Sequence, residues 1–252
     1  MREPAKAGSW YPSDARALRA LLQSFVARVP QRDFKAAIVP HAGYACSGLT
    51  AGKVYSMLPK VNTYVIVGPN HYYPIVSVSD EPWRTPLGKV DVNTAIIEKL
   101  DIDVNNKANK EDNAIELQVP FLQYLFDDFT IVPITMGLQG PESISQVSDT
   151  LQHVADEDFI LIASSDFTHY EPDQVARQKD RWVMEPILKL DASEFLKRSR
   201  STSVCGFGPI AVAMEFAKYR GAEQGELVNY STSAETCGDP MAVVGYAGVI
   251  MA

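Results

Sequence analysis

Three of the four histidines follow apolar segments of strand length, at the point where each segment ends. His41 follows AAIVP, His71 follows VIVGPN, and His169 follows ILIASSDFT. In an open α/β sheet, ligands bind outside the carboxyl ends of the strands, so these imidazoles can converge on one crevice. Asp166 lies three residues before His169, and we expect it in the same crevice. His153 falls inside a predicted helix, where we expect it on the surface.

Each of these residues also has an ordinary structural interpretation. A single histidine after a strand usually hydrogen-bonds within its own loop. Asp166, after two serines, would serve equally well as a helix cap. The shared site is favoured because three histidines and an aspartate, placed independently, would not all be expected at strand ends.

The residue types in this crevice are those that bind first-row metals. Neutral imidazoles bind Fe²⁺, Cu²⁺ and Zn²⁺, and a carboxylate or a thiolate completes the set. Cys205 is the candidate thiolate, because Pro209 in CGFGPIA (205–211) suits the start of a helix, and a helix N-terminus favours a thiolate and tolerates an anionic ligand. The spacing is not that of a compact CxxC or HExxH motif, so the fold must assemble the site.

Strand-sized apolar runs alternate with amphipathic helical segments along the chain. Strands are predicted at 35–40, 63–69, 129–134, 159–165, 226–231 and 242–251, and helices at 14–28, 49–58, 114–125, 141–155, 173–198 and from about 209. This alternation indicates an α/β fold in which helices cover both faces of a largely parallel sheet. No linker divides the chain, so residues 1–252 are predicted to form a single domain. The polar stretch 101–113 is predicted to be a mobile, solvated loop.

Composition and the lengths of the apolar runs limit the classes of partner and the cellular location that we expect. The charge sum of 23 basic and 31 acidic residues is −8, which argues against nucleic acid or an anionic membrane as the main partner. The first residues have no apolar core of the signal-peptide kind, and no run approaches a membrane span, so a cytoplasmic location is predicted. With three widely spaced cysteines, a disulfide is not expected. Cys46 is predicted to be buried beside His41 without a role, and Cys237 to be a turn residue.

Six motifs together resemble the Memo family, whose microbial members are labelled system protein B of the AmmeMemoRadiSam group. They are AGSWYP (7–12), VPHAGYACSG (39–48), VGPNH (67–71), IELQVPFLQ (115–123), SSDFTHY (164–170) and CGFGPIA (205–211). Their order and spacing span almost the entire chain. The family resembles class III extradiol dioxygenases of the LigB type, which implies a three-layer α/β/α sandwich around a largely parallel or mixed sheet.

The resemblance also implies roles for individual residues. His41, His71 and Cys205 fall on the family's metal-binding positions. Asp166 and His169 fall on the other polar positions of the same pocket.

The chain departs from the related patterns in two places. Where the family often has EHSIE, this chain has DNAIE (112–116), so Asn113 replaces a frequent histidine and no proton-transfer role is expected there, whereas Glu116 matches. A cysteine also takes the place of the carboxylate that the dioxygenases use. A thiolate favours softer or redox-active metals and is itself oxidisable, which weakens the case for ring cleavage.

Three functional hypotheses follow. The leading one is a metal-dependent, dioxygenase-like redox protein that holds Fe²⁺ or Cu, with Zn as a further possibility, at His41, His71 and Cys205. Asp166 and His169 would be its acid/base groups, and the ligand would be a small molecule or a peptide. The second is a metal-free hydrolase or transferase with Cys205 as nucleophile, His169 as base and Asp166 as the residue that orients it. The third is a non-enzymatic adaptor that binds a peptide or small ligand in a vestigial pocket.

Overall fold

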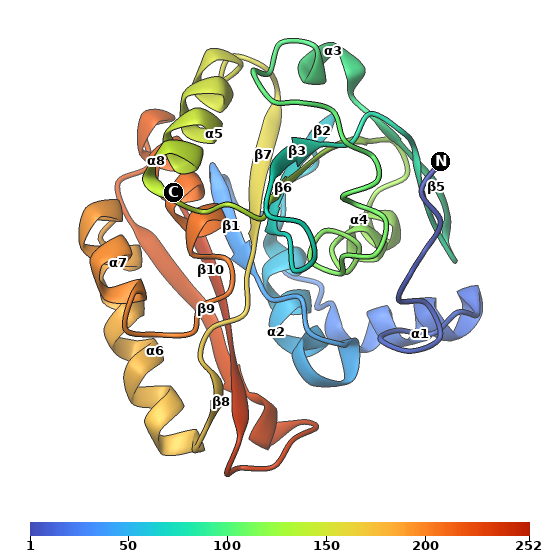
Figure 1. Cartoon of the computed structure of the whole chain (residues 1–252). Helices are drawn as coiled ribbons and strands as arrows, with labels where there is room; N and C mark the ends of the chain where they lie inside the picture. The colour runs from blue at the N-terminus through green and yellow to red at the C-terminus, as the bar shows by residue number, and fades with distance from the viewer.

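The computed structural model describes residues 1–252 and is built on a ten-stranded mixed sheet (Figure 1). The strands are β1 (Ala36–Val39), β2 (Thr63–Pro69), β3 (Val76–Val78), β4 (Trp83–Thr85), β5 (Gly88–Val92), β6 (Thr130–Met136), β7 (Phe159–Ser164), β8 (His169–Glu171), β9 (Gly225–Thr232) and β10 (Val243–Met251). Their order is β4-β5-β6-β2-β7-β1-β10-β8, with β3 beside β6 and β9 beside β10. The five strands from β5 to β1 run parallel, and the other pairings are antiparallel.

Helices cover both faces of this sheet. They are α1 (Ala15–Phe25), α2 (Tyr44–Met57), α3 (Thr94–Ile97), α4 (Val119–Leu125), α5 (Pro141–His153), α6 (Asp173–Leu188), α7 (Ala192–Ser199) and α8 (Phe207–Tyr219). Helices α1, α2 and α4 pack together on one face, and α5 to α8 pack on the other (Figure 1). The predicted three-layer α/β/α sandwich is therefore confirmed. No helix is both long and apolar enough to cross a membrane.

The central strands are apolar along their whole length because both of their faces are buried. In β1, Ala36 and Ile38 point into the core beneath α5 to α8, whereas Ala37 and Val39 point into the core beneath α1, α2 and α4. Strands β2 and β7 alternate in the same way. This two-sided burial is typical of parallel sheets, and it explains why these strands stand out in the sequence.

Several predicted helix boundaries were wrong. The segment 173–198 forms two helices, because Leu190 adopts a left-handed conformation with φ of 51° and Asp191 caps α7 by accepting a hydrogen bond from the Glu194 N–H. Helix α2 begins at Tyr44 rather than at 49, and α4 begins at Val119 rather than at 114. The sequence did not predict β3, β4, β5 or α3, which are short elements with few apolar residues in a row.

The stretch 101–113 was predicted to be solvated, and its second half is so only in part, since Lys107, Lys110 and Glu111 are exposed but their neighbours are not. Ala108, Asn109 and Asp112 are buried there. Asn70 donates a hydrogen bond to the Ala108 carbonyl over 2.8 Å, and Arg2 donates one to the Asn109 carbonyl over 2.6 Å. The backbone carbonyls of this stretch accept these hydrogen bonds from side chains elsewhere in the chain, and they tie the stretch to the rest of the protein.

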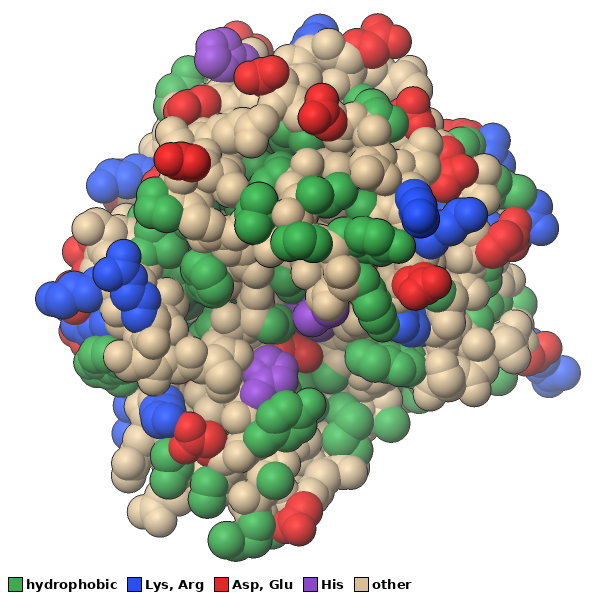
Figure 2. Space-filling view, in the orientation of Figure 1, with side chains coloured by type: hydrophobic (Ala, Val, Ile, Leu, Met, Phe, Trp, Pro, Cys, Tyr) green, Lys and Arg blue, Asp and Glu red, His purple; other side chains and the backbone are tan.

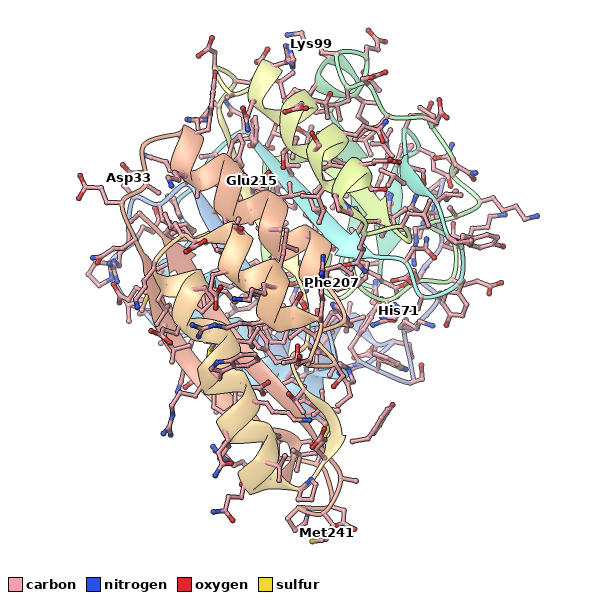
Figure 3. The ribbon with its side chains drawn as sticks, turned by 60° about the vertical axis from the view of Figure 1, so that its left-hand side comes forward. Asp33, His71, Lys99, Phe207, Glu215 and Met241 are labelled. Carbon is pink, nitrogen blue, oxygen red and sulfur yellow. A yellow bond between two sulfur atoms is a disulfide. The ribbon has the colours of Figure 1, made fainter.

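The cysteine prediction was also wrong, because Cys46 and Cys237 form a disulfide across 191 residues of sequence. The antiparallel pair β9 and β10 carries the loop between them back onto α2, where the Thr236 hydroxyl donates to the Cys46 carbonyl. Met241 lies at the outer tip of this part of the molecule (Figure 3). Cys205 is the one free cysteine.

This pairing predicts the number of titratable thiols. Protein denatured without reductant should react with one equivalent of a thiol reagent, at Cys205, and reduced protein should react with three. Peptide mapping under non-reducing conditions should recover Cys46 and Cys237 in one linked species. Three reactive thiols before reduction would contradict the pairing.

Candidate metal centre

Three neighbouring parallel strands deliver the polar residues of the site. Strand β7 lies between β2 and β1, so the carboxyl ends of all three meet at one edge of the sheet. His41, His71 and Asp166 each follow the end of one of these strands by two residues. Cys205 precedes α8, which packs on β7 and β1. Histidine side chains with an acidic side chain between them lie at a hollow in the middle of this face (Figure 2).

The side chains of His41, His71 and Cys205 form a compact set of donors that could hold a metal ion. One nitrogen or sulfur from each lies within 4.8 Å of the others, and His41 Nε2 is 3.3 Å from Cys205 Sγ. Ligand atoms around a tetrahedral first-row ion lie about 3.5 Å apart, so one ion fits among them after small side-chain movements. His41 is buried, Cys205 is half-buried, and the His71 side chain is 38% exposed, which leaves the centre accessible from one side.

Hydrogen bonds fix the ring of His41 with its Nε2 toward the cysteine. Ser164 Oγ donates its single hydrogen to the Ala114 carbonyl and accepts one from Gln118, so it must accept from His41 Nδ1, which lies 2.9 Å away. Burial lowers the pKa of His41 and keeps the ring neutral. The lone pair on Nε2 is therefore free to bind a metal.

Asp112 holds His71 in the same way. One oxygen of Asp112 lies 2.9 Å from His71 Nδ1 and also accepts the His71 backbone N–H. Burial acts against the charged carboxylate, but the hydrogen bonds from His71 and Ala114 outweigh it, and the pKa of Asp112 lies below its usual value. The hydrogen bond to Asp112 raises the pKa of His71. A carboxylate in this position orients a metal-binding imidazole and makes it a stronger donor.

Cys205 lies against the end of β7. Its Sγ accepts a hydrogen bond from the Asp166 backbone N–H over 3.2 Å. A Cβ on Gly206 would lie 2.7 Å from the Ser164 carbonyl oxygen, so only glycine lets the chain approach this closely. Burial, reinforced by the Asp166 carboxylate, raises the pKa of the Cys205 thiol to about 12. In the metal-free protein, burial therefore disfavours the thiolate that was predicted at this helix N-terminus.

Asp166 and His169 lie in the same region but outside the set of three ligands. Asp166 accepts the backbone N–H of His41, and its other oxygen lies 4.0 Å from His41 Nε2. His169 begins the edge strand β8, and its Nδ1 donates to the Ser203 carbonyl over 2.9 Å. His169 Nε2 makes no hydrogen bond within the protein.

Two other residues of the DNAIE segment support the site from behind. Asn113 donates to the His41 carbonyl, which is a structural contact in place of the family's frequent histidine. Glu116 is fully buried, forms an ion pair with Arg2 over 2.6 Å, and accepts hydrogen bonds from the backbone of Ala5 and Lys6.

Arg2 extends this support to His71. Its guanidinium donates to the Asp112 carbonyl and packs over the Trp83 ring. No role was predicted for Asp112, Ser164 or Arg2. Ser164 and Asp112 stood in noted motifs, but Asp112 also lay in the presumed loop and Arg2 is far away in sequence, so only the fold brings them to the histidines.

Comparison with known proteins places these features in one family. A profile described as Memo-like protein matches residues 2–250. A MEMO1 family protein of Methanosarcina barkeri is 43% identical over the full length of both chains. MEMO1 family proteins of Archaeoglobus fulgidus and Thermoplasma acidophilum are 44% and 38% identical, and each match covers at least 98% of both chains.

Breaking the buried ion pair should be among the most destabilising single changes. Glu116→Gln leaves Arg2 charged without its partner in a site closed to water, and we expect the free energy of unfolding to fall by about 3–5 kcal/mol. Denaturant unfolding measures this change. Glu226→Gln breaks the exposed Arg32–Glu226 pair and is the matched control, expected to change little. Equal effects of the two variants would contradict the assigned role.

The raised pKa of Cys205 predicts that its thiol is alkylated slowly. In metal-free native protein, iodoacetamide should alkylate Cys205 slowly at neutral pH. The rate should rise about tenfold per pH unit up to the edge of the native range, because only the thiolate reacts. Unfolded protein, whose cysteines have ordinary pKa values, is the control. Native alkylation at pH 7 as fast as in the unfolded chain would contradict this account.

Proposed function

The chain belongs to the Memo family, and we propose that it is a redox protein that binds one Fe²⁺ or Cu ion through His41, His71 and Cys205. The observation that carries the proposal is the state of the two imidazoles. Each has its Nδ1 held by a separate partner, Ser164 or Asp112, and so presents Nε2 as a donor. A zinc ion would also suit two nitrogens and one sulfur.

The donor set favours a borderline or soft metal over a hard one. A thiolate with two imidazoles suits copper, iron and zinc, whereas magnesium and calcium prefer oxygen ligands. A bound cation displaces the thiol proton, so the metal supplies the charge compensation that the buried sulfur lacks in its absence. The metal would supply electron transfer, or polarise a small ligand that enters beside the exposed His71 ring.

Asp166 and His169 are suited to proton transfer at this centre. Asp166 presents one oxygen near His41 Nε2, and its other oxygen is held by the His41 backbone N–H. His169 keeps Nε2 free because Nδ1 donates to Ser203. Such groups would assist a ligand at this centre by accepting or returning a proton.

The metal-free cysteine mechanism has less support. A nucleophilic cysteine needs a lowered pKa or an adjacent base, whereas the Cys205 pKa is raised by burial. The imidazole nearest to its sulfur is His41, whose own pKa is lowered by burial, so it is a poor acceptor for the thiol proton. His169 and Asp166 do not form a relay to Cys205, since the His169 ring bonds Ser203 instead.

Metal content tests the proposal. Protein purified under nitrogen, without an affinity metal column, should contain close to one equivalent of iron or copper by elemental analysis. His41→Ala and Cys205→Ser should lose it while they stay folded. Asp112→Asn removes only the carboxylate that orients His71, and should weaken metal affinity by about 10–100-fold.

His153→Ala is the matched histidine control, because His153 lies at the end of α5 and bonds its own helix. It should keep the parent's metal content. Full metal content in both His41→Ala and Cys205→Ser, or no metal in the parent after reconstitution, would refute the proposed centre.

A further inference from the structure

A cavity of about 450 Å³ lies between the ends of α5, α7 and α8, beside the segment that carries Cys205. Its apolar walls are Pro141, Ile144, Leu196, Val204 and Phe207. The ligand residues of the metal centre are not part of its lining. Figure 3 shows Phe207 at the end of α8 that points toward the middle of the molecule, whereas Glu215 lies farther along the helix. The volume is that of a small-molecule site.

The polar side chains around this cavity are already used, with one exception. Ser199 donates to the Leu196 carbonyl, and Thr202 donates to the Ser199 carbonyl. The exposed Arg200 has no carboxylate partner, whereas its neighbours Lys197 and Arg198 pair with Glu194. No acidic residue lines the cavity, although the chain carries a net charge of −8. The cavity therefore offers an apolar body and one free positive charge.

Gln139 joins the cavity wall to the candidate metal centre. Its side-chain nitrogen donates to the Cys205 carbonyl over 2.9 Å, and its side-chain oxygen accepts the Gly208 N–H over 2.7 Å. Val204 and Phe207 line the cavity on either side of Cys205 in sequence. A molecule in the cavity would thus contact the same turn that positions the sulfur.

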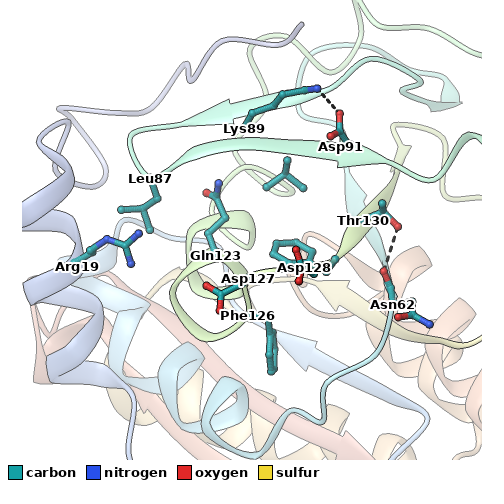
Figure 4. A pocket seen from close by; sticks show the side chains of 12 residues that line it. Arg19, Asn62, Leu87, Lys89, Asp91, Gln123, Phe126, Asp127, Asp128 and Thr130 are labelled. Carbon is teal, nitrogen blue, oxygen red and sulfur yellow. Dashed lines mark hydrogen bonds and ion pairs between the residues drawn. The ribbon is translucent and has the colours of Figure 1, made fainter.

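A second cavity, of about 510 Å³, has a different character. It lies beside β5 and the end of α4, on the part of the sheet away from β1 and β7 (Figure 4). Lys89 and Arg19 line it together with Asp91, Asp127 and Asp128, so its positive charges are offset. Lys89 already pairs with Asp91 over 2.6 Å. This cavity has no preference for an anion and provides a matched comparison.

We propose that the cavity beside Cys205 binds a small organic monoanion, a carboxylate on an apolar ring or chain. The carboxylate pairs with Arg200, and the apolar part packs against Leu196, Val204 and Phe207. Arginine binds carboxylates through two parallel hydrogen bonds, which a single free guanidinium can supply for one such group. Any influence of this molecule on the metal centre, through the turn that carries Cys205, rests on the proposed function, but its binding does not require a metal.

The test compares 3-phenylpropionate with its uncharged amide on the full-length, metal-free protein, by calorimetry and by NMR of the Val204 methyl groups. We expect the acid to bind about tenfold more tightly than the amide, because a charge-assisted hydrogen bond is lost in the amide. Arg200→Gln should remove this preference and leave the amide unchanged. Leu196→Trp, which fills the cavity, should weaken both ligands.

Lys89→Gln in the second cavity is the control and should leave both affinities unchanged. Equal binding of acid and amide, no binding of either, or an equal loss in Lys89→Gln would overturn the proposal. Because no metal is present, failure of the metal centre would leave this result standing. If the parent protein contains the metal but does not bind 3-phenylpropionate, this inference is refuted and the proposed metal centre is not.

Discussion

The site depends on the parallel pairing of β2, β7 and β1. Because these strands lie side by side and run in the same direction, the residues that follow them meet at one edge of the sheet. Their two-sided burial between the helix layers holds the backbone of each strand in register. His41 and His71 are 30 positions apart in sequence, yet their ring centres are 5.5 Å apart. Without this register no local motif in the chain would gather the donors.

Hydrogen bonds then fix the orientation of the two histidine rings. Ser164, at the end of the middle strand, turns the His41 ring, and Asp112 turns the His71 ring from the opposite side. Asp112 is held in turn by the N-terminal segment through Arg2, whose charge is balanced by Glu116. The buried ion pair is costly to form and costlier to break, so it ties the chain terminus to the site. The protein thereby presents two oriented imidazole rings, and burial keeps the neighbouring sulfur protonated.

The sequence was sufficient for the architecture and for the candidate ligands, which the fold brings together, but not for the residues that support them. Alternation of apolar runs and helices predicted the layers, since burial on both faces of parallel strands leaves a clear pattern. His41 and His71 were found because strand ends are visible in sequence. Asp112 and Arg2 were missed because their partners lie 41 and 114 residues away and their surroundings are polar. The Cys46–Cys237 disulfide was missed because its two cysteines are far apart in sequence. The raised pKa of Cys205 depends on burial, which only the fold defines.

The central claim is that one ion is bound by two imidazole nitrogens and one sulfur. X-ray absorption fine structure of the protein loaded with zinc, a redox-inert substitute, tests it most directly. The account predicts nitrogen neighbours at about 2.0–2.1 Å and one sulfur at about 2.3 Å, with the sulfur absent in Cys205→Ser. A first shell of nitrogen and oxygen alone in the parent protein would contradict it.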